Sequence, residues 1–264
     1  MIDNGMCGTS EMRDRRVRFV TIFIVSALSF ILATSVLWAG PPFTTDDPET
    51  PEYRHGEFYI ASQYAKDNEG KSATAPHFEF NYAVMPDVML HTIVPLAWNK
   101  PNDESSNYGL GDVELGVLYR FIHESDTIPQ VGAFPILTLP TGDEDRGLGD
   151  GRCKLFLPLW FKKSWGPWSS YAGGGYQINP GGNRKNYWFT GWQVQRELSE
   201  FLAVGAEIFY ITADTEDGGD SSGFNVGAII NLTEKHHLLF SIGEDIHGPT
   251  DLAMYIGYQL TFGP

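Results

Sequence analysis

The chain has 264 residues, 42% of them hydrophobic and 14% aromatic, which is enough for one large domain. Its mean hydropathy of -0.20 argues against a polytopic helical membrane protein. The formal net charge of -15 excludes nucleic-acid binding, because that function requires clustered Lys and Arg side chains.

The N-terminus has the features of a secretory signal peptide over residues 1–39. A basic segment precedes a nearly unbroken apolar run at residues 19–37. Cleavage is expected after Ala39, and residues 33–35 offer a second site. The apolar run is also long enough to span a membrane, so an uncleaved anchor is the alternative interpretation. The Pro-Pro pair that follows the run favours cleavage.

Residues 40–54 come next and are acidic and rich in proline. This segment is predicted to be either a periplasmic lead-in to the first strand or a plug inside the fold. Cys7 would leave with the signal peptide, so Cys153 stands alone and no intramolecular disulfide is expected.

The rest of the chain consists of short runs that alternate between apolar and polar residues, the pattern of a strand whose two faces meet different surroundings. In residues 111–121, Val113 and Leu115 fall on one face, whereas Asp112 and Glu114 fall on the other. Twelve strands are predicted on this basis. They lie near residues 55–65, 76–85, 88–98, 111–121, 130–139, 152–162, 167–178, 186–196, 201–212, 223–232, 236–243 and 251–262.

The connections between these strands alternate between long and short. The long, polar connections are residues 66–75, 99–110, 140–151, 179–185, 213–222 and 244–250. The short ones are residues 86–87, 164–166, 197–200 and 233–235, with one of intermediate length at 122–129. An outer-membrane barrel accounts for this alternation, because its long loops face outside and its tight turns face the periplasm.

The predicted fold is therefore an all-β, transmembrane, antiparallel up-and-down β-barrel of about twelve strands over residues 55–264. A half-exposed soluble sheet would show the same alternation of residues. Little of this chain is left over to cover the apolar face of such a sheet, so the sequence favours the barrel and the cell outer membrane.

Two Gly-Leu-Gly-Asp repeats, at residues 109–112 and 147–150, each close an outer loop and open a strand. Their glycines allow a tight turn back into the wall. A phosphate-binding loop is disfavoured, because neither a helix N-terminus nor a lysine follows.

Together with residues 42–48 and 139–143, these repeats resemble a family of outer-membrane transporters named for its link to a meta-cleavage pathway of phenol degradation. The first segment reads Pro-Phe-Thr-Thr-Asp-Asp-Pro and the second Leu-Pro-Thr-Gly-Asp. The resemblance spans about residues 41–262. It implies a barrel that passes small hydrophobic or aromatic molecules, and it carries no catalytic residues.

The polar faces of the predicted strands define a candidate lumen. They carry His77, Glu79, Asn81, His91, Asp112, Glu114, Arg120, Lys154, Gln177, Glu207, Asn225, Asn231, Asp251 and Gln259. One interpretation is a channel lining that selects solutes by charge and hydrogen bonding. The other is a plugged interior in which Arg120 and Lys154 pair with acidic residues to satisfy buried charge. Twelve strands predict a narrow or gated path rather than a wide pore.

Two outer loops, near residues 143–150 and 214–220, are acidic and are candidates for cation binding, whereas the His236-His237 pair is discounted because adjacent strand residues point to opposite faces. Neither loop has EF-hand spacing, so solvated loops are the preferred interpretation, and no metal site or cofactor is predicted. The tryptophans lie mostly near strand ends or turns, which predicts interfacial girdles.

The sequence thus predicts a channel-like outer-membrane transporter rather than an enzyme. A barrel phospholipase would need Ser and His at matching depth on the lipid face, and no such pair is found. The alternative is a non-conducting structural or adhesive barrel with cation-binding loops. The expected partners are outer-membrane lipid, lipopolysaccharide and a small-molecule solute. The barrel-assembly machinery is a further expected partner, because alternating apolar residues that end on Phe262 fit the C-terminal signal that this machinery reads.

Overall fold

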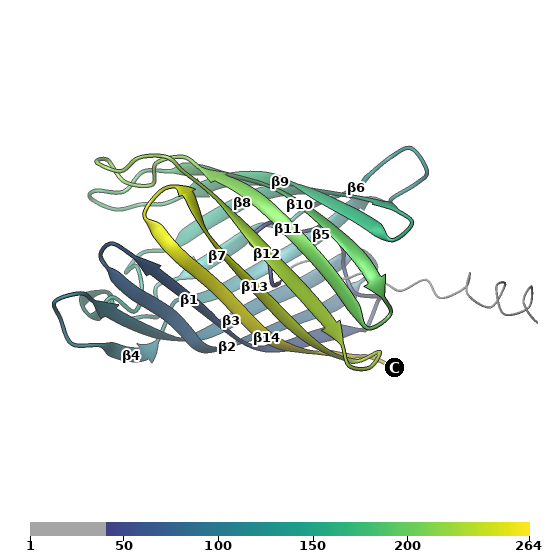
Figure 1. Ribbon diagram of the computed structural model, residues 1–264, viewed down its shortest axis with the longest axis horizontal. Helices are drawn as coiled ribbons and strands as arrows, with labels where there is room; N and C mark the ends of the chain where they lie inside the picture. Colours follow the sequence, from purple (N-terminus) through teal and green to yellow (C-terminus); the bar gives the residue numbers. More distant parts are fainter. Residues whose placement is uncertain (1–40) are drawn as a thin grey trace, which may run out of the picture. The chain divides into compact units, whose positions relative to one another are not determined.

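The computed structural model describes residues 41–264, which form a closed β-barrel (Figure 1). The predicted signal peptide at residues 1–39 lies outside the described residues. None of the helices in the described part of the chain is long and apolar enough to cross a membrane.

Fourteen strand segments make up the barrel. They are β1 (Gly56–Asp67), β2 (Gly70–Met85), β3 (Val88–Pro101), β4 (Asn107–Leu110), β5 (Val113–Ile122), β6 (Gln130–Ala133), β7 (Ile136–Leu139), β8 (Lys154–Trp165), β9 (Trp168–Ile178), β10 (Tyr187–Ser199), β11 (Leu202–Ile211), β12 (Ser221–Asn231), β13 (His236–His247) and β14 (Thr250–Phe262). A 3-10 turn, η1 (Glu144–Arg146), lies in the connection before β8.

These segments form twelve antiparallel strands around the barrel, as predicted. β4 and β5 together form one strand, because both pair with β3, and β6 and β7 together form another, because both lie between β5 and β8. The barrel closes where β1 pairs with β14, from Gly56 opposite Phe262 to Lys66 opposite Leu252. Closure leaves no open sheet edge, as a membrane-spanning sheet requires.

The strand predicted at residues 130–139 is interrupted at Phe134 and Pro135. Proline has no N–H group to donate to a neighbouring strand, so the ladder cannot continue through it. The carbonyl of Pro135 still accepts from the N–H of Val117 (3.1 Å), and the N–H of Phe134 donates to Pro158 (3.3 Å). The interruption is therefore a local bend within one wall strand.

Two predicted long loops are wrong. Strands β1 and β2 extend through residues 66–75 until only Asn68 and Glu69 connect them, and β13 and β14 likewise extend through most of residues 244–250. The hydrogen-bonded ladder simply continues beyond the alternating apolar region, because polar residues pair across strands as well as apolar ones do. The long connections that remain are residues 140–153, 179–186 and 212–220.

The two ends of the barrel differ. The end that carries residues 102–106, 140–153, 179–186 and 212–220 is called the loop end here. The opposite, turn end carries the connections at residues 86–87, 123–129, 166–167, 200–201 and 232–235, together with the C-terminus (Figure 1). The two-residue turns 68–69 and 248–249 lie at the loop end. In outer-membrane barrels the longer connections face the outside.

Burial in this fold is inverted relative to a soluble protein. Large apolar side chains such as Phe80, Leu115 and Ile256 are exposed on the outer surface, whereas Glu79 and Gln193 are buried inside. Lipid is the only solvent that matches an apolar outer surface of this extent.

Candidate functional site

The barrel interior is the candidate site, and most of the predicted lining residues lie there. Eight of them are buried inside the barrel: His77, Glu79, Asn81, His91, Gln177, Glu207, Asn225 and Gln259. Asp112, Glu114, Arg120, Lys154 and Asn231 are half-buried. Asp251 is half-exposed at the loop end, where it pairs with Lys66 at 3.0 Å. Whether these residues contact a solute remains a prediction.

One side of the interior, formed by β14, β1, β2 and β3, is a continuous polar wall. The Tyr59 hydroxyl donates to Glu57 Oε2 (2.8 Å) and accepts from Gln259 Nε2 (2.8 Å). Asn81 Nδ2 donates to Glu79 Oε1 at 2.8 Å, and its Oδ1 lies 2.7 Å from His91 Nδ1. Chains of hydrogen bonds of this kind hold buried polar side chains in fixed positions.

The adjoining side of the interior, from β3 to β10, carries an aromatic cluster that the sequence interpretation missed, and Phe134 meets the ring of His91 edge-on at 5.2 Å. Met89, Leu118, Phe134, Trp160 and Phe189 are buried together, and Trp160 is only 1% exposed. Trp160 therefore does not belong to an interfacial girdle, which corrects the prediction for that tryptophan. The inward parity of Leu118, an exception to the alternation of its strand, was the signal for this cluster.

A cavity of about 560 Å³ lies between these two sides. Its lining includes His77 and Glu79 from the polar wall, and Phe134 and Ile136 from the aromatic side. Phe43, from the segment before β1, also borders it. The cavity is thus large enough for a small organic molecule and offers both apolar surface and hydrogen-bonding groups.

The N-terminal segment, residues 41–55, precedes β1, and its residues 41–51 run inside the barrel, whereas residues 52–54 are exposed. The buried carboxylate of Glu207 accepts from the N–H groups of Thr44 (2.8 Å) and Thr45 (2.7 Å). Ser241 Oγ donates to the Pro42 carbonyl at 2.6 Å. Further along, Glu49 forms an ion pair with the buried Lys162. These contacts join the segment to β11, β13 and β8, so it spans the interior.

Glycines on the inner face make room for this segment. A methyl group added at Gly205 or Gly227 would lie 2.9 Å from Cζ of Phe43 in each case, too close for any side chain. A methyl group at Gly132 would likewise lie 2.9 Å from Cβ of Pro48. The N-terminal segment therefore occupies a groove that exists because those positions lack side chains.

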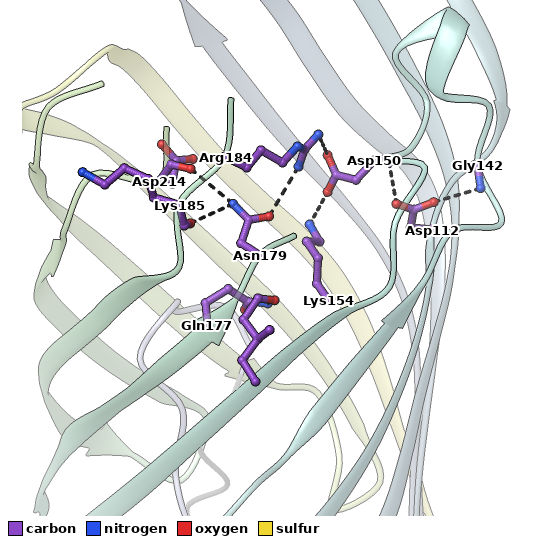
Figure 2. A network of polar contacts seen from close by, with 10 residues as sticks. Asp112, Gly142, Asp150, Lys154, Gln177, Asn179, Arg184, Lys185 and Asp214 are labelled. Atoms are coloured by element: carbon purple, nitrogen blue, oxygen red, sulfur yellow. Dashed lines mark hydrogen bonds and ion pairs between the residues drawn. The ribbon is translucent and has the colours of Figure 1, made fainter. Parts of the chain in front are cut away.

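The loop end carries a separate network of charged and amide groups (Figure 2). Figure 2 shows Asp150 between Lys154 and Arg184, with Asp112 beside it on the side of Gly142. Asp112 and Asp150 are the last residues of the two Gly-Leu-Gly-Asp repeats. The repeats thus meet in space, which their separation in sequence did not reveal.

The two predicted lumen cations are both paired with carboxylates. Lys154 pairs with Asp150 at the loop end, and Arg120 donates to Asp87 at the turn end through Nε (2.8 Å) and Nη2 (2.6 Å). Burial acts to raise the pKa of the Asp87 carboxyl, but the contacts with Arg120 outweigh it and lower that pKa. Arg120 accordingly acts as a clamp for the 86–87 turn.

Neither the interior nor the loops show the geometry of a metal centre. Within residues 41–264, no group of three or more His, Cys, Asp or Glu side chains is arranged to hold a metal ion. The polar groups are instead arranged to hydrogen-bond to one another and to the N-terminal segment.

Known structures share this fold. The chain is similar to the COG4313 outer-membrane channel of Pseudomonas putida F1, with 17% identity, a TM-score of 0.69 and coverage of 82% of this chain and 98% of the other. It is also similar to the KdgM porin (10% identity, TM-score 0.55, coverage 77% and 99%) and the NanC porin (7%, 0.56, 77% and 98%). At these identities the similarity establishes the outer-membrane barrel fold.

No curated protein matches this chain. A family model does match it, over residues 70–260, and its description is "Putative MetA-pathway of phenol degradation". That match covers more than half of the chain, from the start of β2 almost to the end of β14. The resemblance inferred from the short motifs is thereby confirmed, and the chain belongs to this family of phenol-degradation-associated proteins.

Proposed function

We propose that this protein is an outer-membrane channel for the passive passage of small hydrophobic or aromatic compounds. The observation that carries the proposal is the interior cavity of about 560 Å³, bounded by a polar wall on one side and by Phe134 and Ile136 on the other. A polar porin lining would offer no apolar surface, and a filled barrel would offer no cavity. The family description, which names phenol degradation, supports the same class of cargo.

An apolar hollow on the outer surface adds support for apolar cargo. It measures about 620 Å³ and is lined by side chains such as Leu90, Leu115 and Val117. His91 borders both this hollow and the interior cavity, and Gly116, which carries no side chain, borders the hollow beside it. The wall between the cavity and the lipid is therefore thin at this position.

In this proposal the N-terminal segment is the plug of the channel. It lies against the cavity and is held by Glu207, Ser241 and Lys162, so passage requires it to shift. The residues of the polar wall, with the other predicted lining residues, form the solute path. The signal peptide is cleaved, lipopolysaccharide surrounds the loop end, and the barrel-assembly machinery inserts the chain.

Uptake by whole cells tests the proposal, because the lipopolysaccharide leaflet slows apolar compounds that would cross a simple lipid vesicle. Cells that produce the protein should take up a labelled aromatic acid or phenol faster than cells that produce a variant whose plug is cross-linked to the wall. A labelled sugar of similar size should enter both at the same rate. Equal uptake of the aromatic compound by both strains would contradict the proposal.

The alternative functions predict different results. A structural or adhesive barrel would show neither aromatic uptake nor ion conductance in planar bilayers, even after the plug is displaced. A barrel hydrolase would release fatty acid from phospholipid, and we propose that this protein has no such activity. Measuring both conductance and lipid hydrolysis on the refolded protein separates the three.

A further inference from the structure

The roof loop, residues 142–150, is attached to the wall at both of its ends by one side chain. Asp112 Oδ1 accepts from the N–H of Gly142 (2.9 Å), and Asp112 Oδ2 accepts from the N–H of Asp150 (2.7 Å). Both ends of the roof loop are therefore held beside Asp112, which lies between β4 and β5. Its middle is held on the same side, because Asn107 Nδ2 donates to the Arg146 carbonyl (3.0 Å) and Arg146 Nη2 donates to the Tyr108 carbonyl (3.1 Å). These contacts with β4 and Asp112 form one continuous line of attachment along one side of the opening.

One contact, through the side chain of Asp150, fastens the roof loop to a different hairpin across the opening. Arg184, in the connection between β9 and β10, donates through Nη2 to Asp150 Oδ1 at 2.8 Å, and Lys154 pairs with the other oxygen (Figure 2). The side chains of Asp150 and Arg184 are 30% and 31% exposed. A pair this accessible to water is screened by salt and is easily broken.

The roof loop also forms part of the wall of the loop-end opening. A cavity of about 360 Å³ is bordered by Gly147, Leu148 and Asp150 on one side and by the inward residues His77 and Glu114 on the other. His77 and Glu114 border the central cavity as well. Leu148 is buried against the barrel, so the roof loop folds over the interior and covers the entrance to it.

We propose that the roof loop is a hinged lid over the loop-end entrance, with Asp112 as its hinge and the Asp150–Arg184 ion pair as its latch. The inference rests on the proposed function, since a lid has meaning only if solute passes beneath it. Breaking the latch frees the lid on the side of β9 and β10 while the hinge holds it on the wall. Breaking the pair also leaves the barrel wall intact, because Arg184 lies outside every strand.

Single-channel recording of the full chain in planar bilayers tests the latch. Every protein compared carries Glu207→Ala, which displaces the plug so that the lid alone sets the opening frequency, and this background is the unmodified protein of the comparisons below. Arg184→Gln should raise the opening frequency about threefold to fivefold, as expected for loss of a half-exposed ion pair. The matched control is Arg152→Gln, which removes an exposed arginine from the same end of the barrel. Raising the ionic strength should increase the opening frequency of the unmodified protein and leave that of Arg184→Gln unchanged.

A reversible cross-link keeps the test independent of folding defects. Asp150→Cys and Arg184→Cys are combined with Cys153→Ser and joined by a bifunctional methanethiosulfonate reagent. The uncross-linked variant should open as often as Arg184→Gln, the cross-linked one less often than the unmodified protein, and a reductant should reverse the change. An opening frequency that does not change when the cross-link forms would contradict the lid proposal.

Failure of the lid and failure of the channel give different results. If a variant with a displaced plug conducts, but neither Arg184→Gln nor the cross-link alters its opening, the lid proposal is wrong and the channel proposal stands. If the variant with the displaced plug conducts nothing, both are wrong.

Discussion

The interior is covered by two segments that are held in different ways. The N-terminal segment is fixed by buried partners, above all by Glu207, which is 2% exposed. The roof loop is fixed by Asp112 and by an ion pair that is about one-third exposed. Removing a partner from a buried polar group leaves an unsatisfied group, whereas water replaces the partner of an exposed one.

This difference implies a hierarchy of motions. The roof loop should open often and at low cost, and the plug should shift rarely. Solute would then reach the cavity beneath the roof loop well before it passes the plug. The following substitutions test that order, beginning with the largest expected effect.

Glu207→Ala should release the plug. The substitution leaves the N–H groups of Thr44 and Thr45 and the amide of Asn225 without their acceptor, at a cost of about 3 kcal/mol. Labelling of a Thr45→Cys, Cys153→Ser background by a thiol reagent measures the release, because Thr45 is fully buried while the plug is seated. Glu200→Ala, at an exposed turn, is the control. A labelling rate equal to that of the control would show that Glu207 does not hold the plug.

Gly205→Leu should displace Phe43 by steric exclusion and destabilise the seated plug by about 2 kcal/mol. Combining it with Phe43→Ala should restore the protection of the plug from thiol labelling, because the space left by the Phe43 ring then accepts the leucine side chain. Gly182→Leu adds the same side chain where nothing lies within 4 Å and is the control. Additive effects in the double variant would rule out the proposed contact.

Asp112→Asn should loosen the hinge of the roof loop. One amide N–H then faces the donor group of the new side chain instead of an oxygen, at a cost of about 1 kcal/mol. Limited proteolysis within residues 143–147 should become faster, whereas cleavage in the N-terminal segment should not. Faster cleavage in both segments would mean that the two are coupled rather than independent.

The smallest effect is the response of the latch to acid. Burial acts to raise the pKa of Asp150, but hydrogen bonds from Arg184 and Lys154 outweigh it, so the pKa of this carboxyl in the folded protein lies below its ordinary value. The stabilisation is therefore present above that value and is lost as the pH falls through the lowered pKa. Opening frequency should rise in that acidic range, and Arg184→Gln should weaken the dependence.

Alternation of residues predicted the wall of the barrel well. Eight of the proposed lining residues are buried inside because a period of two places them there once the outer face is apolar. Trp160 was misplaced because this rule was not applied to it. It was assigned to the lipid interface as a tryptophan near a predicted strand end, without regard to its parity. Parity, rather than residue type, was the reliable signal.

The contacts that matter for function were harder to predict. The groove beneath Phe43 depends on Gly205 and Gly227, which lie on neighbouring strands and become adjacent only when β11 and β12 pair in register. The meeting of Asp112 with Asp150 likewise depends on how residues 140–153 fold back. The sequence reveals residue types and periods, but it does not reveal cross-strand register, from which these contacts arise.

The seam between β1 and β14 has a consequence for how the protein is made. It joins residues 56–67 to residues 250–262. Strand β1 therefore gains its second neighbouring strand only when β14, the last strand, is in place. The N-terminal segment directly precedes β1 and must lie on the inner side when that seam forms. The segment is therefore enclosed only in barrels whose seam has closed. Protection of the segment from a protease distinguishes closed barrels from open assembly intermediates.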